Sequence, residues 1–234
     1  MKKGQEVMDK VVEKMGIYEL FTVFGAGIIS VIIWLVAFGN QYINIIIYND
    51  NNFNWAIFLI ICYIVGLILQ EVSSFLDAKF LKFRISARKN FLNDNKIIRN
   101  EEELRLYREL AKKELNKSEL SEKDNEFFHF ISKTYLERHS DNSKTSRINS
   151  IYGMSRSLAL ASNIAILVTI GAYFFYGNTF NILGKISICP VLMVNIEIIL
   201  SALFYYRAKR FAEYKVRVIM RYYWDEMKNN KQNS

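Results

Sequence analysis

The sequence predicts an all-α membrane protein with four transmembrane helices, arranged as two hairpins that flank a cytoplasmic helical insertion. Two observations predict this class. Four blocks are almost free of charge and are long enough to cross a bilayer, while charged residues are dense in the longest segment between them. One proline and ten glycines among 234 residues do not suit a turn-rich β architecture.

Composition divides the chain into five segments. The first has an apolar stripe between charges, which predicts an amphipathic cytoplasmic helix at the membrane surface. Two hairpins, an insertion of helices and a basic helical tail follow. The predicted boundaries are 1–19 for the amphipathic helix, 20–76 for the first hairpin, 77–156 for the insertion, 157–206 for the second hairpin and 207–234 for the tail. Within the hairpins, the crossing segments are 20–38, 53–76, 158–176 and 186–206.

Capping residues predict helices inside the insertion. Asn100 precedes three glutamates, which suits a helix that begins at Glu101. Ser121 and Asp124 have the spacing of a capping box for a second helix. A third helix follows the polar run at residues 140–143 and leads directly into the third span.

The second, third and fourth spans are predicted to project inward as long helices. No Gly- or Pro-rich break separates Phe75 from Phe91, or Tyr206 from Trp224. Apolar residues continue at helical spacing through both stretches. The stripe after the second span is Leu76, Phe80, Phe83, Ala87 and Phe91, and the stripe in the tail is Phe211, Tyr214, Val218 and Tyr222.

The distribution of Lys and Arg predicts the orientation. Of the 31 basic residues, only Lys185 lies in a predicted outer loop. Cytoplasmic segments are enriched in Lys and Arg, so both termini and the insertion are expected in the cytoplasm, with the spans in a plasma membrane (the bacterial inner membrane). The net charge of +8 is thereby explained by topology and anionic lipid.

Glu197 is the principal candidate site residue. At 1.5 Å per residue it lies roughly 15 Å from the boundary at Arg207, near the middle of the membrane. An acid at that depth is costly and faces protein or water. Two interpretations remain open: a functional group that is either a proton or cation site or part of a pore lining, or a protonated acid that joins helices by a hydrogen bond, within one chain or between chains. By the same depth argument, the candidate polar column is Gln70, Glu71, Asn163, Asn195 and Glu197.

Two further features concern helix packing. Pro190 is expected in the first turn of the fourth span, in preference to a kink near the polar column. Small residues recur every fourth position along the third span, a pattern that lets helices approach closely in lipid. They form either a dimerisation face or a seam within one chain: Gly153, Ser157, Ala161, Ala165 and Thr169.

Basic residues next to the spans are expected to contact lipid phosphates. Anionic lipid of the cytoplasmic leaflet is therefore the favoured partner, and nucleic acid is disfavoured. The expected headgroup contacts are Lys79, Lys82, Arg84, Arg88, Lys89, Arg207, Lys209 and Arg210.

Catalysis and cofactors are not expected. No Gly-rich phosphate loop, HExxH motif, cysteine pair or G-x-S-x-G motif is present. His129 and His139, the two histidines, share no helix face that would hold a metal. Cys62 and Cys189 lie in predicted spans and are interpreted as packing residues.

The layout supports three functional hypotheses. The first is a homo-oligomeric sensor or effector, in which a signal or soluble partner at 77–156 rearranges the spans and opens a pore or perturbs the bilayer. The second is a small proton- or cation-coupled transporter, or a subunit of one. The third is a passive anchor that recruits a soluble protein. The plan resembles small bacterial membrane sensors and effectors, including defence-associated ones, at the level of layout alone.

Overall fold

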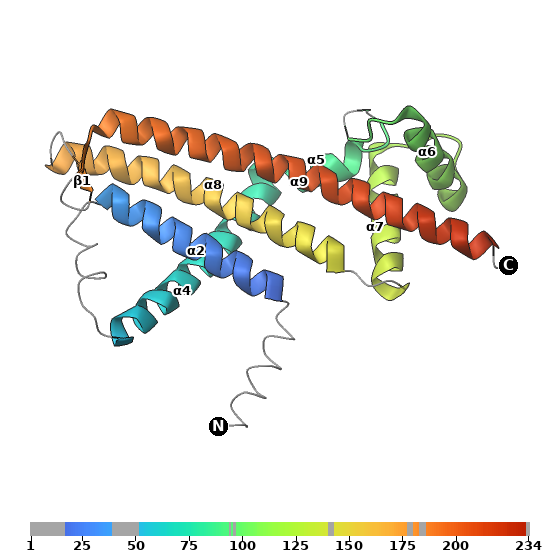
Figure 1. The fold of residues 1–234 in the computed structure, drawn as a ribbon. Coiled ribbons are helices and arrows are strands. Elements are labelled where there is room, and N and C mark those ends of the chain that lie inside the picture. The colour runs from blue at the N-terminus through green and yellow to red at the C-terminus, as the bar shows by residue number, and fades with distance from the viewer. Residues whose placement is uncertain are drawn as a thin grey trace, which may run out of the picture. The chain divides into compact units, whose positions relative to one another are not determined.

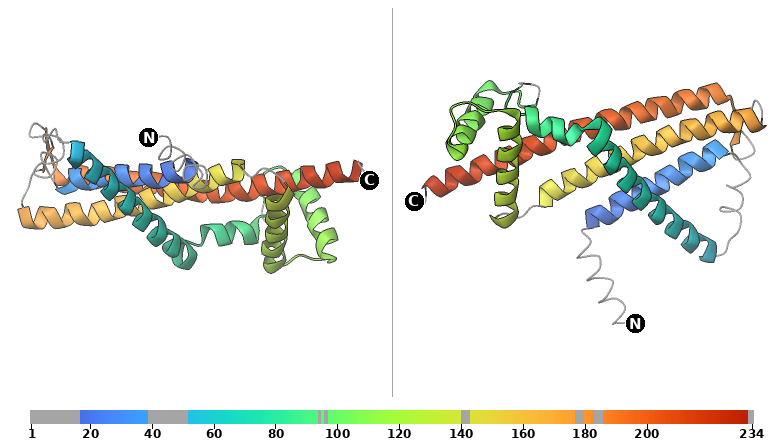
Figure 2. Two further views of the ribbon diagram at one scale, coloured as in Figure 1. Left: turned by 90° about the horizontal axis from the view of Figure 1, so that it is seen from below. Right: turned by 180° about the vertical axis from the view of Figure 1, so that it is seen from behind.

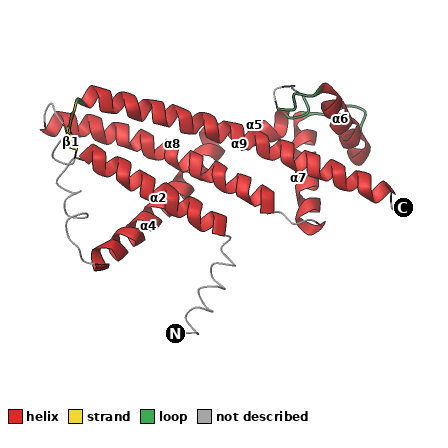
Figure 3. Ribbon diagram, in the orientation of Figure 1, coloured by secondary structure: helices red, strands yellow, loops and turns green. Residues whose placement is uncertain are grey.

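The computed structural model describes residues 17–38, 52–93, 95, 97–139, 143–176, 180–182 and 186–232. Most of these residues form helices, which are joined by short loops and one short hairpin of strands (Figure 3), and this confirms the all-α prediction in its coarse form. The amphipathic helix predicted for 1–19 lies almost wholly outside the described residues. The helices are α2 (Ile17–Phe38), α4 (Asn52–Leu76), α5 (Phe83–Asn90), α6 (Glu101–Leu115), α7 (Glu122–His139), α8 (Ser143–Tyr176) and α9 (Pro190–Gln232).

Three stretches are long and apolar enough to cross a membrane. They are Trp55–Leu81, Arg147–Phe174 and Pro190–Asn229. A shorter apolar stretch, Thr22–Leu35, lies within α2. These findings agree with a membrane protein, and the fourth crossing and the two-hairpin arrangement stay predictions.

The chain forms two compact units. We call Met1–Phe75 with Gly153–Arg207 the apolar unit, and Leu76–Tyr152 with Ala208–Ser234 the basic unit. Helices α8 and α9 each contribute residues to both units without interruption. The prediction that both segments continue as long helices beyond their apolar parts is therefore confirmed, and the inward direction of these extensions stays a prediction.

Within the apolar unit, α2 and α4 approach backbone to backbone (Figures 1 and 2). A Cβ atom added at Gly27 would lie 1.8 Å from the carbonyl oxygen of Cys62, and one added at Gly66 would lie 2.1 Å from the carbonyl oxygen of Val23. Both distances are far below van der Waals contact. The two helices can cross this closely only because glycine stands at both positions.

The fourth span begins later than the sequence indicates. Helix α9 begins at Pro190, whereas residues Ile186–Ile188 form strand β2, which pairs antiparallel with β1 (Phe180–Ile182). The predicted start at Ile186 is therefore wrong. Pro190 occupies the first helical position, as predicted, where its missing N–H costs nothing.

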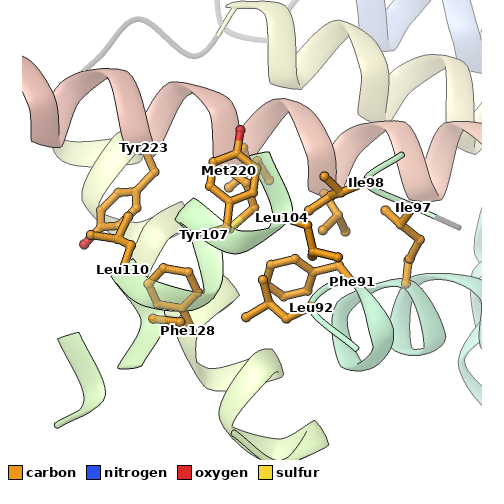
Figure 4. Close-up of a cluster of buried hydrophobic side chains, with 14 of the residues drawn as sticks. Phe91, Leu92, Ile97, Ile98, Leu104, Tyr107, Leu110, Phe128, Met220 and Tyr223 are labelled. Carbon is orange, nitrogen blue, oxygen red and sulfur yellow. The ribbon is translucent and has the colours of Figure 1, made fainter. Parts of the chain in front are cut away.

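The basic unit has its own hydrophobic core (Figure 4). Side chains from α5, α6, α7 and the tail of α9 meet there, and Phe128 and Tyr223 stack edge to face with ring centres 5.8 Å apart. The sequence alone divides this region into an insertion and a separate tail, but the core joins them. Its fully buried members include Phe91, Ile98, Leu104, Ile219 and Met220.

The tail buries a face that matches the predicted stripe only in part: Val218 is buried and Phe211 is partly buried, as predicted. Ala208, Ala212, Val216 and Ile219 are buried, and so is Tyr223, whereas the predicted stripe residues Tyr214 and Tyr222 are exposed. The two alanines pack against Phe83 and Tyr152. Small side chains select this face because they allow close approach, whereas the pattern of large aromatics indicates its neighbour.

The predicted caps of the insertion are confirmed. The Asn100 side chain accepts hydrogen bonds from the backbone N–H groups of Glu102 and Glu103, and α6 begins at Glu101. At α7, the N–H of Asp124 donates to Ser121 Oγ while Asp124 Oδ2 accepts from the N–H of Ser121. These reciprocal bonds satisfy amide groups that have no partner inside the helix.

The second span does not continue as one helix, contrary to the prediction. Helix α4 ends at Leu76, a single π-helical turn (η1, Asp77–Leu81) follows, and Lys82 adopts a left-handed conformation with φ 53° before α5 starts. Phe80 is accordingly exposed although it belongs to the predicted stripe. The continuous-helix prediction fails here because buried side-chain bonds to Asp77 compensate for an unfavourable backbone conformation at Lys82.

Candidate functional site

Glu197 lies buried inside the apolar unit. Its side chain is 1% exposed, and its Oε1 accepts a hydrogen bond of 2.8 Å from Thr169 Oγ1 on α8. Its second oxygen, Oε2, has no hydrogen-bond partner among the described residues. A buried carboxyl group with one unsatisfied oxygen is costly, so this position is able to hold a proton or a cation.

A second polar cluster joins α4 and α8 in the same unit. Arg156 is 6% exposed, and its Nε donates to Ser73 Oγ at 3.1 Å while its Nη2 donates to the carbonyl oxygen of Gln70 at 3.4 Å. The hydroxyl groups of Ser73 and Ser157 lie 3.4 Å apart. The guanidinium group thus links two spans through hydroxyl and carbonyl oxygens.

Sequence reasoning treats Arg156 only as the boundary of the third span and misses this role. The available signal is the pair of serines beside it, at positions 155 and 157, where the polar beginning of the helix passes into its apolar part. Small neighbours allow another helix to cover a long basic side chain that otherwise extends to the membrane surface.

The five predicted members of the polar column do not form one network. Asn163 and Asn195 are exposed; Ser201 Oγ donates to Asn163 Oδ1 at 3.0 Å, and Asn195 donates to the carbonyl oxygen of Val191 at 2.7 Å. Glu71 is exposed at the inner end of α4, and Gln70 is partly buried. Only Glu197 is buried, so depth along the helix axis alone did not group these residues.

The stripe of small residues on α8 is buried along its whole length. Other helices of the same chain occupy it: Ser73 of α4 faces Ser157, Trp34 Nε1 of α2 donates to the carbonyl oxygen of Ala161 at 3.1 Å, and Glu197 of α9 accepts from Thr169. In this structure the stripe therefore packs against helices of its own chain.

Several predicted headgroup residues have partners within the protein. Arg84 Nε lies 3.4 Å from Asp77 Oδ2, and Arg88 Nη2 lies 3.5 Å from Glu126 Oε1. The other members of that group are exposed, or partly exposed in the case of Lys89, and their contacts with lipid stay predictions: Lys79, Lys82, Lys89, Arg207, Lys209 and Arg210.

Asp77 is the centre of a third polar cluster, in the basic unit. Its side chain is 3% exposed; Oδ1 accepts from the N–H of Phe83 at 3.1 Å, and Oδ2 accepts from the hydroxyl of Tyr152 at 2.5 Å. The Arg84 guanidinium carbon lies 5.4 Å above the Tyr152 ring. This carboxylate joins the start of α5 to α8 at the break in the second span.

No protein family model, curated protein or solved structure matches the chain.

Proposed function

We propose that this chain is an integral membrane sensor or effector, in which four helices cross the bilayer and the basic unit on the cytoplasmic side couples a signal or partner to rearrangement of the spans. The observation that carries the proposal is helix α9. One uninterrupted helix of 43 residues contains buried Glu197 in its apolar part and core residues such as Met220 in the basic unit. A rigid helix transmits displacement, whereas a flexible linker absorbs it.

Helices α8 and α9 are the expected route of coupling. Both pass from one unit to the other within a helix, while the second span is interrupted at Lys82. Thr169 and Glu197 join these same two helices inside the apolar unit. A displacement of α9 relative to α8 would separate the one hydrogen bond that satisfies the buried acid, which gives the apolar unit two distinguishable arrangements.

Exposed polar side chains in the spans favour a homo-oligomer. Asn195 is exposed in the apolar part of α9, and so is Asn163 in that of α8. Amide groups are unfavourable against hydrocarbon and are found at helix interfaces in membranes. A second copy of the chain would cover them, and an assembly of several copies would surround a pore or deform the bilayer.

Replacing Glu197 by glutamine tests the proposal. Glutamine keeps the volume and an acceptor for Thr169, but it removes the titratable charge. We expect dye release from liposomes containing the full chain to slow by about tenfold, because one charge strongly affects ion passage in a low-dielectric site. The measurement is release of an encapsulated fluorophore at matched protein density.

Glu71→Gln is the matched control, because it removes the same charge from an exposed position at the inner end of α4. Its release rate is expected to equal that of the unmodified protein. If liposomes with the unmodified chain and with Glu197→Gln are equally tight, the pore form of the proposal is wrong.

A proton- or cation-coupled transporter is the second candidate. The free Oε2 of Glu197 favours it, since a carboxyl oxygen without a partner can accept a proton or ion. Transporters typically have broken helices at the membrane midplane. Helix α9 has no break at that depth, because Pro190 stands at its first position, and this observation ranks the transporter below the sensor.

A further inference from the structure

The basic unit contains a cavity of about 220 Å³ between α7, α8 and α9. Leu136 and Ile219 form its apolar wall, and Lys133, Glu137, Asn149 and Lys215 contribute its polar groups. Drug-sized ligands occupy pockets of about 300–1,000 Å³. This cavity is therefore suited to a ligand smaller than a drug, which has one or two charged groups and only a few other atoms.

Lys215 enters the cavity with a neutral hydrogen-bond partner, whereas Glu137, the acid of the same lining, forms its ion pair with Lys133. Lys215 Nζ donates to Asn149 Oδ1 at 2.9 Å, and it forms no ion pair with a carboxylate among the described residues. The side chain is partly buried. An ammonium group removed from water and paired only with a neutral amide has lost hydration that the protein does not replace. An anion in the cavity would supply the missing interaction.

The surrounding charges make the cavity favourable for an anion. Lys133 Nζ lies 3.2 Å from Glu137 Oε1, but both side chains are about half exposed (46% and 50%), so water screens this pair. Burial is the main cause that lowers the pKa of His129 to about 3, and Arg88, Lys215 and Lys133 lower it further. The lining itself holds two lysines, Lys133 and Lys215, against the single acid Glu137, so the cavity carries a net positive charge.

We infer that this cavity binds the phosphoryl group of a small anionic ligand, with Lys215 and Lys133 as charged donors and the amide nitrogen of Asn149 as a neutral donor. Lysine binds phosphate as a flexible point charge. The apolar wall would contact any small organic part of the ligand. That binding here moves α8 and α9 rests on the proposed function; the binding itself does not.

Titration calorimetry of the full chain in maltoside micelles, with inorganic pyrophosphate as the probe, tests the site. We expect saturable binding that Lys215→Met weakens at least tenfold. The unfolding temperature of Lys215→Met without pyrophosphate should equal or exceed that of the unmodified chain, because the substitution removes an uncompensated charge and keeps the apolar stem. Lys113→Met, at an exposed position of α6, is the matched control and should bind normally.

Lys133→Met changes a second lysine of the cavity lining and should also weaken pyrophosphate binding. It provides the test if Lys215→Met does not fold. The inference is overturned if the unmodified chain shows no saturable binding, or if neither lysine variant differs from Lys113→Met.

Nanodiscs distinguish the source of the phosphoryl group. Loss of pyrophosphate binding in phosphatidylglycerol but not in phosphatidylcholine assigns a lipid headgroup, and equal binding in both assigns a soluble ligand. If the chain binds pyrophosphate through Lys215 but never releases dye from liposomes, this binding site is supported and the pore form of the proposed function is wrong.

Discussion

Replacing Gly27 or Gly66 by alanine is expected to separate α2 from α4 and to destabilise the apolar unit. The added methyl group would meet backbone atoms, 1.8 Å away at Gly27 and 2.1 Å away at Gly66, and backbone cannot rotate aside as a side chain can. Overpacking of this kind costs about 1–3 kcal/mol or more. For a chain of this size, that lowers the unfolding temperature by about 2–4 °C per kcal/mol. Thermal unfolding of the full chain in detergent measures the effect.

Two other glycines provide matched controls. A Cβ at Gly171 would meet no atom of the described residues within 4 Å, and one at Gly25 would lie 3.7 Å from the flexible end of Met154. Both alanine variants should unfold within about 2 °C of the unmodified chain, because small changes away from tight contacts alter stability little. The Gly27 and Gly66 substitutions act at one crossing, so their combined effect should be less than their sum. Equal unfolding temperatures for Gly27→Ala and Gly171→Ala would contradict the close crossing.

Replacing Asp77 by alanine is expected to release the start of α5. The substitution leaves the buried N–H of Phe83 and the hydroxyl of Tyr152 without this acceptor and removes the charge that faces Arg84. A buried donor left without an acceptor costs about 1–3 kcal/mol, whereas Arg84, whose side chain is 37% exposed, can turn to water. Peptides covering residues 83–90 should therefore exchange amide hydrogens faster, as measured by mass spectrometry on the full chain.

Asp77→Asn gives a graded test, because asparagine keeps an acceptor for the N–H of Phe83 but loses the charge. Its exchange should be intermediate. Asp225→Ala removes an acid from an exposed position of α9 and is the control for a change in net charge. Unchanged exchange in residues 83–90 of Asp77→Ala would show that the carboxylate does not hold this junction.

The sequence predicts features that depend on local chemistry. Asn100, Ser121 and Asp124 cap helices through side chains that reach amide groups two or three residues away, so their spacing alone is informative. Pro190 is equally local, since its ring is tolerated in a first helical turn. Long apolar blocks predict helices because lipid leaves the backbone no other partner than itself.

The sequence does not predict features that depend on packing between distant segments. Lys82 adopts a positive φ without being glycine, so no residue type marks the break after α4. Asn195 and Glu197 have similar depth, but two residues rotate a helix by about 200°, and they consequently face different surroundings. The predicted polar column depends on depth along the helix axis alone, and it leaves out the direction in which each side chain points around that axis. Arg156 is missed for the same reason, because burial of its side chain depends on Ser73 of another helix.

Cysteine labelling on intact cells most directly tests the central claim that the chain crosses a membrane with the basic unit inside. Cys189 is exposed immediately before α9, whereas Cys62 is buried. A membrane-impermeant maleimide added outside should label Cys189. A second variant combines Cys189→Ser with Ser118→Cys, which places the new cysteine at an exposed position of the basic unit. This cysteine should react only after the cells are lysed. Labelling of the Ser118→Cys variant from outside, or protection of Cys189 until lysis, would contradict the account.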